Sequence, residues 1–179
     1  MSNYHPRRSV LYMPAANERA LEKAKDIQAD SLIFDLEDAV APDSKEIARE
    51  QACAAAASSD YGNRELTIRC NGLDTPWGKE DVLAAAAAAP AAVVIPKVDG
   101  PAYLDQISDL LNQGGAPPST QIWAMVETPV GILHVDKIAH HKRMSVMVLG
   151  TNDMAKELRA TVTADRATLL PYLSMCLLS

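Results

Sequence analysis

The sequence predicts a parallel α/β fold of the TIM-barrel type, (β/α)₈, of which this chain supplies about six β/α units. Short apolar runs alternate with longer segments whose apolar residues recur at helical spacing, at a period of roughly 20 to 35 residues. Several runs also end on a charged residue, as barrel strands do when their carboxyl ends line a site. No seventh run follows, so we expect one barrel domain, residues 1–179, that lacks its C-terminal part.

Composition and charge exclude several classes of protein. A hydrophobic content of 48% is enough for a core, and the net charge of −6 disfavours a nucleic-acid partner. No apolar run, that of residues 1–14 included, is long enough for a signal peptide or a membrane span, so we expect a cytoplasmic protein with no membrane partner. Cys53, Cys70 and Cys176 show neither paired nor metal-ligand spacing, which fits a reducing compartment.

The first unit pairs a strand over residues 9–13, stopped by Pro14, with a helix over residues 17–27. Asn17 is expected to cap this helix. Arg19 and Lys23 lie on its exposed face, where such residues are either simply solvated or able to hold phosphate groups.

The second unit places three acids at one strand end. In residues 31–40, Asp35 and Glu37 share a face and Asp38 lies just beyond them. Like charges this close are unfavourable, so a compensating cation is expected. Arg69, which closes the next strand in residues 65–71, is the candidate. It could steady a substrate oxygen, form a structural ion pair with Asp35 or Glu37, or do both.

The intervening helix is expected over residues 41–59 with Ser44 as its cap. After an Ala-rich helix over residues 79–90, the fourth strand ends at Lys97. A desolvated lysine there could form a Schiff base with a carbonyl substrate, the mechanism of a metal-free aldolase. The next helix, residues 101–115, has Gly114 and Gly115 as its stop.

The last two strands supply the strongest signal. The runs 121–127 and 145–153 read as strands buried on both faces, and they end on the carboxylates Glu127 and Asp153. Between them, residues 128–144 read as one helix, so that a right-handed β-α-β crossover brings both acids to one rim. Two such acids suit a hard divalent cation, although acids after strands can also be solvated loop residues or helix caps.

Other signals are absent or weak. The sequence contains no GxGxxG, P-loop or GxSxG motif. We expect His134, His140 and His141 to be surface or structural residues. Residues 169–179 read as a helix, and an open six-stranded sheet would leave unpaired edges, so the chain is expected to be a fragment or to be covered in an oligomer.

Six segments in matching order resemble the HpcH/HpaI aldolase and citrate lyase family, in particular its citrate lyase β-subunit-like and malyl-CoA lyase branch. They are residues 8–24, 31–40, 67–71, 93–98, 125–131 and 148–158. The resemblance implies a TIM barrel that uses Mg²⁺, with Mn²⁺ as an alternative, to make or break a bond between an acyl-CoA and a 2-oxo acid. It further implies a homo-oligomer, a trimer or a hexamer.

The same resemblance implies roles for individual residues. Glu127 and Asp153 would be the metal ligands, Arg69 would contact substrate oxygens, and Glu37 and Asp38 would lie near the metal and that arginine. Thr151, Asn152 and Glu127 would contribute to substrate binding, and Arg19 and Lys23 would approach the CoA phosphates. The family also has a further catalytic acid on a C-terminal segment that has no counterpart here.

The expected function is therefore cleavage of a hydroxydicarboxylyl-CoA of the malyl, citramalyl or citryl type by a metal-dependent carbon–carbon lyase. Two alternatives remain open. The same metal and arginine could activate water for hydrolysis of the thioester, which would make the protein a malyl-CoA-type thioesterase. In the second alternative, the protein is a non-catalytic, truncated barrel or a subunit of a larger complex.

Overall fold

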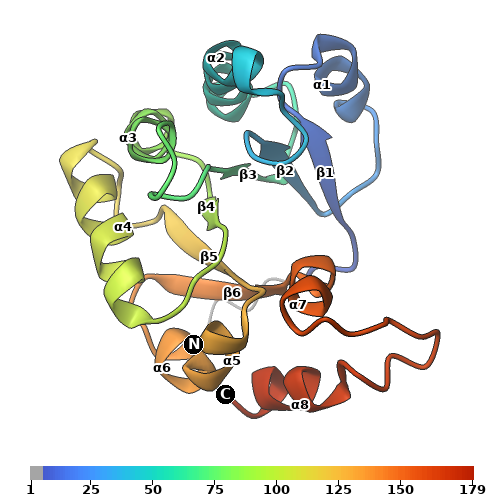
Figure 1. Cartoon of the computed structure of the whole chain (residues 1–179). Coiled ribbons are helices and arrows are strands. Elements are labelled where there is room, and N and C mark those ends of the chain that lie inside the picture. The colour runs from blue at the N-terminus through green and yellow to red at the C-terminus, as the bar shows by residue number, and fades with distance from the viewer. Residues whose placement is uncertain (1–5) are drawn as a thin grey trace.

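The computed structural model describes residues 6–179. Its centre is a six-stranded parallel sheet in which the strands stand in chain order. The strands are Val10–Pro14 (β1), Ser31–Asp35 (β2), Glu65–Arg69 (β3), Ala92–Ile95 (β4), Gln121–Val126 (β5) and Met144–Leu149 (β6). Figure 1 shows them curving into an arc with helices around the outside, which confirms the predicted open barrel. Residues 1–5, included in our argument against a signal peptide, lie outside the described part.

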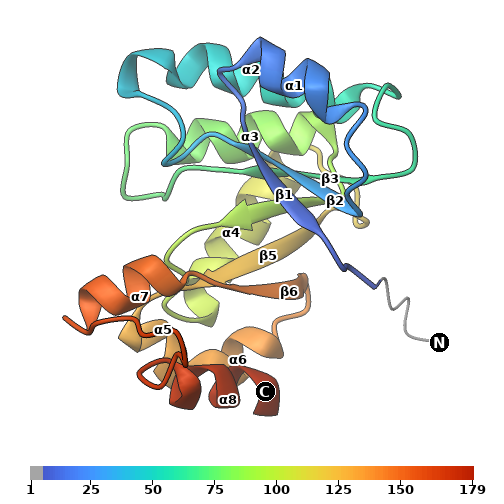
Figure 2. The ribbon, with the colours of Figure 1, turned by 90° about the vertical axis from the view of Figure 1, so that its right-hand side faces the viewer.

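Helices fill each connection between strands, as the right-handed β-α-β crossover requires. They are Glu18–Ala24 (α1), a 3₁₀ turn at Pro42–Ser44 (η1), Lys45–Ala57 (α2), Gly78–Ala88 (α3), Pro101–Gln113 (α4), Pro129–Leu133 (α5), Val135–Ala139 (α6), Thr151–Glu157 (α7) and Leu170–Leu178 (α8). Figure 2 shows the twisted sheet from the side, with α7 following the end of β6.

The helices follow the sequence signals with two exceptions, one at a helix start and one within a predicted helix. Asn17 caps α1 by accepting a hydrogen bond from the Ala20 N–H at 3.1 Å, and the Thr128 hydroxyl accepts one from the Gly131 N–H at 3.0 Å. Ser44 occupies the cap position of α2 but makes no capping bond, because the preceding 3₁₀ turn already leads the chain into the helix. The single helix predicted over residues 128–144 is broken at His134 into α5 and α6.

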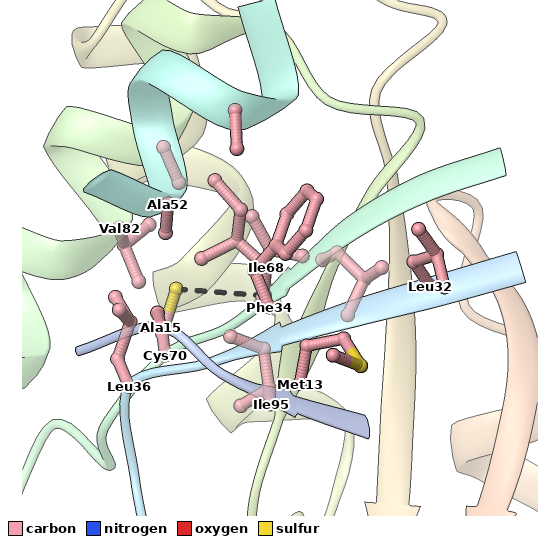
Figure 3. Close-up of a cluster of buried hydrophobic side chains, with 14 of the residues drawn as sticks. Met13, Ala15, Leu32, Phe34, Leu36, Ala52, Ile68, Cys70, Val82 and Ile95 are labelled. Atoms are coloured by element: carbon pink, nitrogen blue, oxygen red, sulfur yellow. Dashed lines mark hydrogen bonds between the residues drawn. The ribbon is translucent and has the colours of Figure 1, made fainter. Parts of the chain in front are cut away.

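The larger of two apolar layers fills the space between the sheet and the outer helices. Side chains at every second strand position, such as Phe34, Ile68 and Ile95, pack against Ala52 of α2 and Val82 of α3. Figure 3 shows this cluster, in which the aromatic ring of Phe34 lies among aliphatic side chains. The alternate strand residues point to the inside of the arc, as the period of two requires.

The inner layer is smaller and lies below the rim formed by the carboxyl ends of the strands. It is built from Ile33, Ala92, Val94, Trp123 and Met125, with Val146 and Val148 of β6 packed against it. Two residues beyond Ile33 and Met125 on the same face stand Asp35 and Glu127, so this layer leads directly to charged residues at the ends of β2 and β5.

The final strand differs from its prediction. We expected the run ending at Asp153 to be buried on both faces, but no residue of β6 is fully buried. The reason is that β6, like β1, is an edge of the sheet, so its inner side chains lack neighbours on one side. The terminal helix α8 is confirmed, and its residues Leu177 and Leu178 are each 87% exposed. Within residues 6–179, no helix has the length and apolar character to cross a bilayer.

Candidate active site

The sheet register brings the charged strand ends together. Asp35 of β2 stands beside Arg69 of β3, and the last residues of β5 and β6 are paired in the same way. Above the inner apolar layer, a cavity of about 370 Å³ opens at this rim. Its lining comes from five strand ends and loops: Tyr12, Asp38, Arg69, Met125, Glu127, Val148, Leu149, Gly150, Thr151, Asn152 and Asp153.

Arg69 is the buried cation that the cluster of acids required. It is only 8% exposed and forms a two-pronged ion pair with Asp35, Nε to Oδ1 at 2.7 Å and Nη2 to Oδ2 at 2.5 Å. Its Nη1 lies 2.7 Å from Glu37 Oε2 and 4.0 Å from Asp38 Oδ2. The guanidinium also lies 5.0 Å from the ring centre of Tyr12. Arg69 therefore combines both expected features. It forms a structural ion pair with Asp35, and it also lines the cavity.

The electrostatics of this cluster favour a permanently charged arginine. Burial opposes the charge on Arg69, but the hydrogen bond and charge of Asp35 hold its pKa above the usual value. Asp35 is itself anchored, since it accepts hydrogen bonds from the backbone N–H groups of Glu37 at 2.8 Å and Ala39 at 3.3 Å. Arg69 is thus fixed in direction, and it presents a rigid positive group to the cavity.

Glu37 has an unusual proton affinity. Burial raises its pKa to about 7 even though the charge of Arg69 opposes that change, and the neighbouring carboxylates, first of all Asp38, add to it. Asp38 itself is largely exposed, its side chain reaching 76%. Of the three predicted acids, Asp35 and Glu37 therefore hold the arginine closely, and Asp38 lies at the mouth of the cavity.

This shift predicts a pH dependence of stability. A carboxyl whose pKa rises from 4.5 in the unfolded chain to about 7 in the fold contributes most stability below pH 4.5, loses it as the pH rises to about 7, and contributes no further change above that. We expect the variant Glu37→Gln to flatten this decline in the metal-free protein. Urea unfolding across that pH interval measures it, and an identical slope in both proteins would contradict the assignment.

Glu127 and Asp153, the two carboxylates predicted to converge, line the same cavity. Glu127 is 4% exposed, and its Oε1 accepts a hydrogen bond from the Lys97 N–H at 2.9 Å. Burial raises the pKa of Glu127, the bond from Lys97 lowers it, and the nearby negative charge of Asp153 raises it further. Asp153 stands in the first turn of α7 and lines the same cavity. The metal-free pair is therefore repulsive, which is the condition that a bound cation relieves.

The donor set fits a hard cation that keeps part of its hydration shell. Within residues 6–179 no group of three or more His, Cys, Asp or Glu side chains converges to hold a metal ion. Two carboxylates beside an open cavity match Mg²⁺, which is typically bound by one or two carboxylates and completes its shell with water and substrate oxygens. They do not match a closed structural zinc site, which needs four protein ligands.

Among the residues that line the cavity but were not predicted from the sequence, Gly150 has the clearest role. It joins β6 to α7, and a Cβ placed on it would lie 2.1 Å from Glu127 Oε2 and 2.6 Å from Glu127 Cβ. The absence of a side chain at position 150 is therefore what lets the two strand ends approach closely enough for Glu127 and Asp153 to share a cavity. A glycine between an apolar run and an acid was the available signal.

We expect Gly150→Ala to displace the Glu127 carboxylate and to weaken Mg²⁺ binding by about 10-fold or more, while the fold persists. Isothermal titration with Mg²⁺ measures this. The matched control is Gly100→Ala, since a Cβ at Gly100 would meet only His134 Nδ1 at 3.4 Å. Equal affinities in the two variants would show that position 150 does not set the geometry of Glu127.

Several other candidates lie apart from the cavity. Lys97 is exposed, so the prediction of a desolvated lysine that could form a Schiff base is wrong. Its contact with the site is the hydrogen bond from its backbone N–H to Glu127. Arg19 and Lys23 are exposed on α1 and do not line the cavity. The histidines are structural or at the surface, as predicted: His134 Nδ1 lies 2.7 Å from the Asp99 carbonyl oxygen, and His140 Nδ1 lies 2.7 Å from that of Asp136.

The sequence of this chain is similar to those of a known family of enzymes. Residues 8–177 match the HpcH/HpaI aldolase/citrate lyase family. A (3S)-malyl-CoA thioesterase of Cereibacter sphaeroides is 46% identical over 175 residues, which cover 98% of this chain and 59% of that protein. Citrate lyase subunit beta of Escherichia coli K12 is 34% identical over 170 residues, or 92% of this chain and 56% of the relative.

The structural comparison agrees with the sequence comparison. A citrate lyase beta subunit from Mycobacterium tuberculosis, complexed with oxaloacetate and magnesium, superposes with a TM-score of 0.75 at 26% identity. The match covers 94% of this chain and 71% of that structure. The chain thus spans less than two thirds of the length of the curated relatives it matches.

Proposed function

Since the chain belongs to the HpcH/HpaI aldolase/citrate lyase family, we propose that it carries the main part of a Mg²⁺-dependent active site that hydrolyses a malyl-CoA-type thioester. The observation that carries this choice is the 46% identity to (3S)-malyl-CoA thioesterases over 98% of the chain, against 32% to 34% for citrate lyase beta subunits and a malyl-CoA lyase. Of our two enzymatic expectations, the hydrolase alternative is therefore favoured over the carbon–carbon lyase.

Glu127 and Asp153 would hold the metal ion. When bound, Mg²⁺ would supply a Lewis acid for substrate oxygens and offset the charge of the two acids. The Lys97 N–H fixes one oxygen of Glu127, and the absence of a side chain at Gly150 leaves room for the other. The hydrogen bond from Lys97 therefore orients the Glu127 carboxylate from the protein side.

Arg69 would act on the reacting thioester. Hydrolysis requires water to attack the carbonyl carbon, negative charge to develop on the carbonyl oxygen, and the C–S bond to break with release of the CoA thiol. A rigid guanidinium is suited to stabilise that oxygen, and Asp35, Glu37 and Asp38 hold or flank it. The first backbone N–H groups of α7, near Thr151 and Asn152, have no partner within their helix and would bind the terminal carboxylate of the malyl group.

Arg19 and Lys23 would contact the CoA phosphates from α1. Their exposure supports a role outside the cavity, where a long substrate such as a CoA thioester must extend. We expect the double variant Arg19→Ala, Lys23→Ala to raise KM for the thioester with kcat unchanged, because exposed charges of this kind contribute only uniform binding. Lys137→Ala, an exposed lysine on α6, is the control, and an unchanged KM in the double variant would remove both residues from the substrate path.

Product analysis separates the candidate functions. With malyl-CoA and Mg²⁺, a thioesterase releases free CoA thiol and malate in equal amounts and no 2-oxo acid. A lyase instead gives acetyl-CoA and glyoxylate without free thiol. A thiol reagent and a carbonyl reagent used in parallel therefore decide between them, and formation of glyoxylate without thiol would overturn the proposal in favour of the lyase. Neither product, with Mg²⁺ still bound, would indicate a non-catalytic barrel.

The predicted assembly into a homo-oligomer also remains a proposal. The inner side chains of β1 and β6 support it, since Tyr12 and Val10 are 38% and 40% exposed at one edge of the sheet, and Val146 and Val148 are only half-buried at the other. Covering such edges removes unpaired backbone groups and apolar surface from water. Light scattering of the purified protein measures the assembly directly.

A further inference from the structure

Behind the Arg69 cluster lies a buried lysine that the proposed chemistry does not use. Lys45 is the first residue of α2 and is 5% exposed. Its Nζ donates hydrogen bonds to the carbonyl oxygens of Leu36 and Glu37, both at 2.7 Å, and to Asn71 Oδ1 at 2.8 Å. All three donors of the ammonium are thus directed at neutral oxygens, and the ring of Trp77 lies 5.2 Å from it.

Helix stability does not explain this placement. A positive charge at the first residue of a helix opposes the helix dipole. Burial also disfavours the ammonium and lowers the pKa of Lys45, although the charges of Asp35, Asp81 and neighbouring acids counter that effect. What the side chain gains instead is a set of contacts to the loop between β2 and α2 and to the loop between β3 and α3.

Those loops begin after Asp35 and Arg69, the two residues that form the two-pronged ion pair at the ends of β2 and β3. The first carries Glu37, and the second starts directly after Arg69. Asn71 links them further, because its Nδ2 donates to the Leu36 carbonyl oxygen at 3.0 Å and to Asp81 Oδ2 at 2.6 Å. Asp81 is fully buried and is held in turn by Arg49 Nε at 2.7 Å.

We propose that Lys45 is a positioning residue for this active site: by binding both loops at once it holds the Glu37 carboxylate against Arg69. The proposal rests on the proposed function, in which Arg69 stabilises the developing oxyanion. Lys45 does not line the cavity and contacts neither predicted metal ligand. It would therefore act on Arg69 through the two loops, and mainly through Glu37, whose carboxylate pairs with the guanidinium.

We expect Lys45→Met, which keeps the aliphatic stem and removes the ammonium, to lower kcat by about 10- to 100-fold while Mg²⁺ affinity is retained. Lys45→Arg should not restore kcat, because a planar guanidinium cannot converge on the same three oxygens. Lys79→Met, an exposed lysine on α3, is the matched control and should behave like the wild type.

A double-mutant cycle tests whether the effect passes through Glu37. Lys45→Met should add little to the loss of kcat caused by Glu37→Gln, whereas independent, purely structural effects would multiply. Multiplying effects, or a normal kcat in Lys45→Met, would overturn the proposal. If Lys45→Met does not fold, Asn71→Ser removes one of the three acceptors and is measured in the same cycle.

A readout without substrate separates this proposal from the proposed function. In metal-free protein, the side-chain Nε–H resonance of Arg69 should shift in Lys45→Met and stay in place in Lys79→Met. If the wild type does not hydrolyse malyl-CoA but this shift is present, the proposed function fails and the positioning role stands. If the wild type is active and the resonance does not move, the positioning role fails alone.

Discussion

Replacing Glu127 by Gln, or Asp153 by Asn, is expected to weaken Mg²⁺ binding by more than about 100-fold and to abolish turnover. Each substitution removes a negative charge and an oxygen ligand from a site that has only two carboxylates to offer. The metal-free variants should be at least as stable as the wild type. Burial is the main reason for the raised pKa of Glu127 and the charge of Asp153 raises it further, and each variant removes at least the repulsion between the two acids. Isothermal titration and thermal unfolding measure the two effects separately.

The control for this pair is Asp136→Asn, which changes an exposed acid on α6 away from the cavity. It should leave Mg²⁺ affinity unaltered, and it should change stability little, because the contact of Asp136 with His140 is exposed. If Glu127→Gln and Asp153→Asn bound Mg²⁺ like this control, the ligands would have to be sought elsewhere.

Replacing Arg69 by Lys is expected to lower kcat by about 10²- to 10³-fold, the typical loss for one oxyanion donor. A lysine keeps the charge, but it cannot reproduce the paired bonds to Asp35 together with the bond to Glu37. The buried carboxylate of Asp35 would lose a partner, which costs about 1–3 kcal/mol of stability. Steady-state kinetics and urea unfolding together measure the change.

The matched control is Arg64→Lys. Arg64 also forms several partly buried bonds, to the carbonyl oxygens of Ala24 at the end of α1 and of Ile27 just after it, but it lies outside the cavity. We expect this variant to lose stability while kcat per folded molecule is retained. A near-normal kcat in Arg69→Lys would exclude the arginine from the chemistry and leave it only the structural role.

Most of the fold could be predicted from the sequence, because the local signals for strands and helices agree with the order in which the strands pair in the sheet. Each strand corresponds to a short apolar run in the sequence. The glycines after residue 113 correctly mark the C-terminus of α4, and the Thr128-Pro129 pair correctly marks the N-terminus of α5. The strand ends were the informative places, since parallel strands joined by right-handed crossovers bring their carboxyl ends to one edge of the sheet. The sequence alone therefore places Glu127, Asp153 and Arg69 on one rim, and the structure has all three lining one cavity.

Features that depend on contacts across the sheet could not be predicted in this way. The close approach of Gly150 to Glu127 depends on how far two neighbouring strands extend, and β6 lost its burial because no strand follows it in the sheet. Lys45 carried no signal in the sequence, since its three acceptors come from two separate loops, the one that directly precedes α2 and the one that follows β3. Lys97 seemed desolvated from its buried run, but the chain turns there with a positive φ of 50° and leaves the side chain in water.

The most direct test of the central claim is anomalous X-ray diffraction from crystals grown with Mn²⁺ in place of Mg²⁺. Bound manganese should give one strong peak between the carboxylates of Glu127 and Asp153, beside Arg69, and the peak should vanish in Glu127→Gln crystals. A peak at any other position, or none at saturating Mn²⁺, would contradict the metal site and the thioester chemistry built on it.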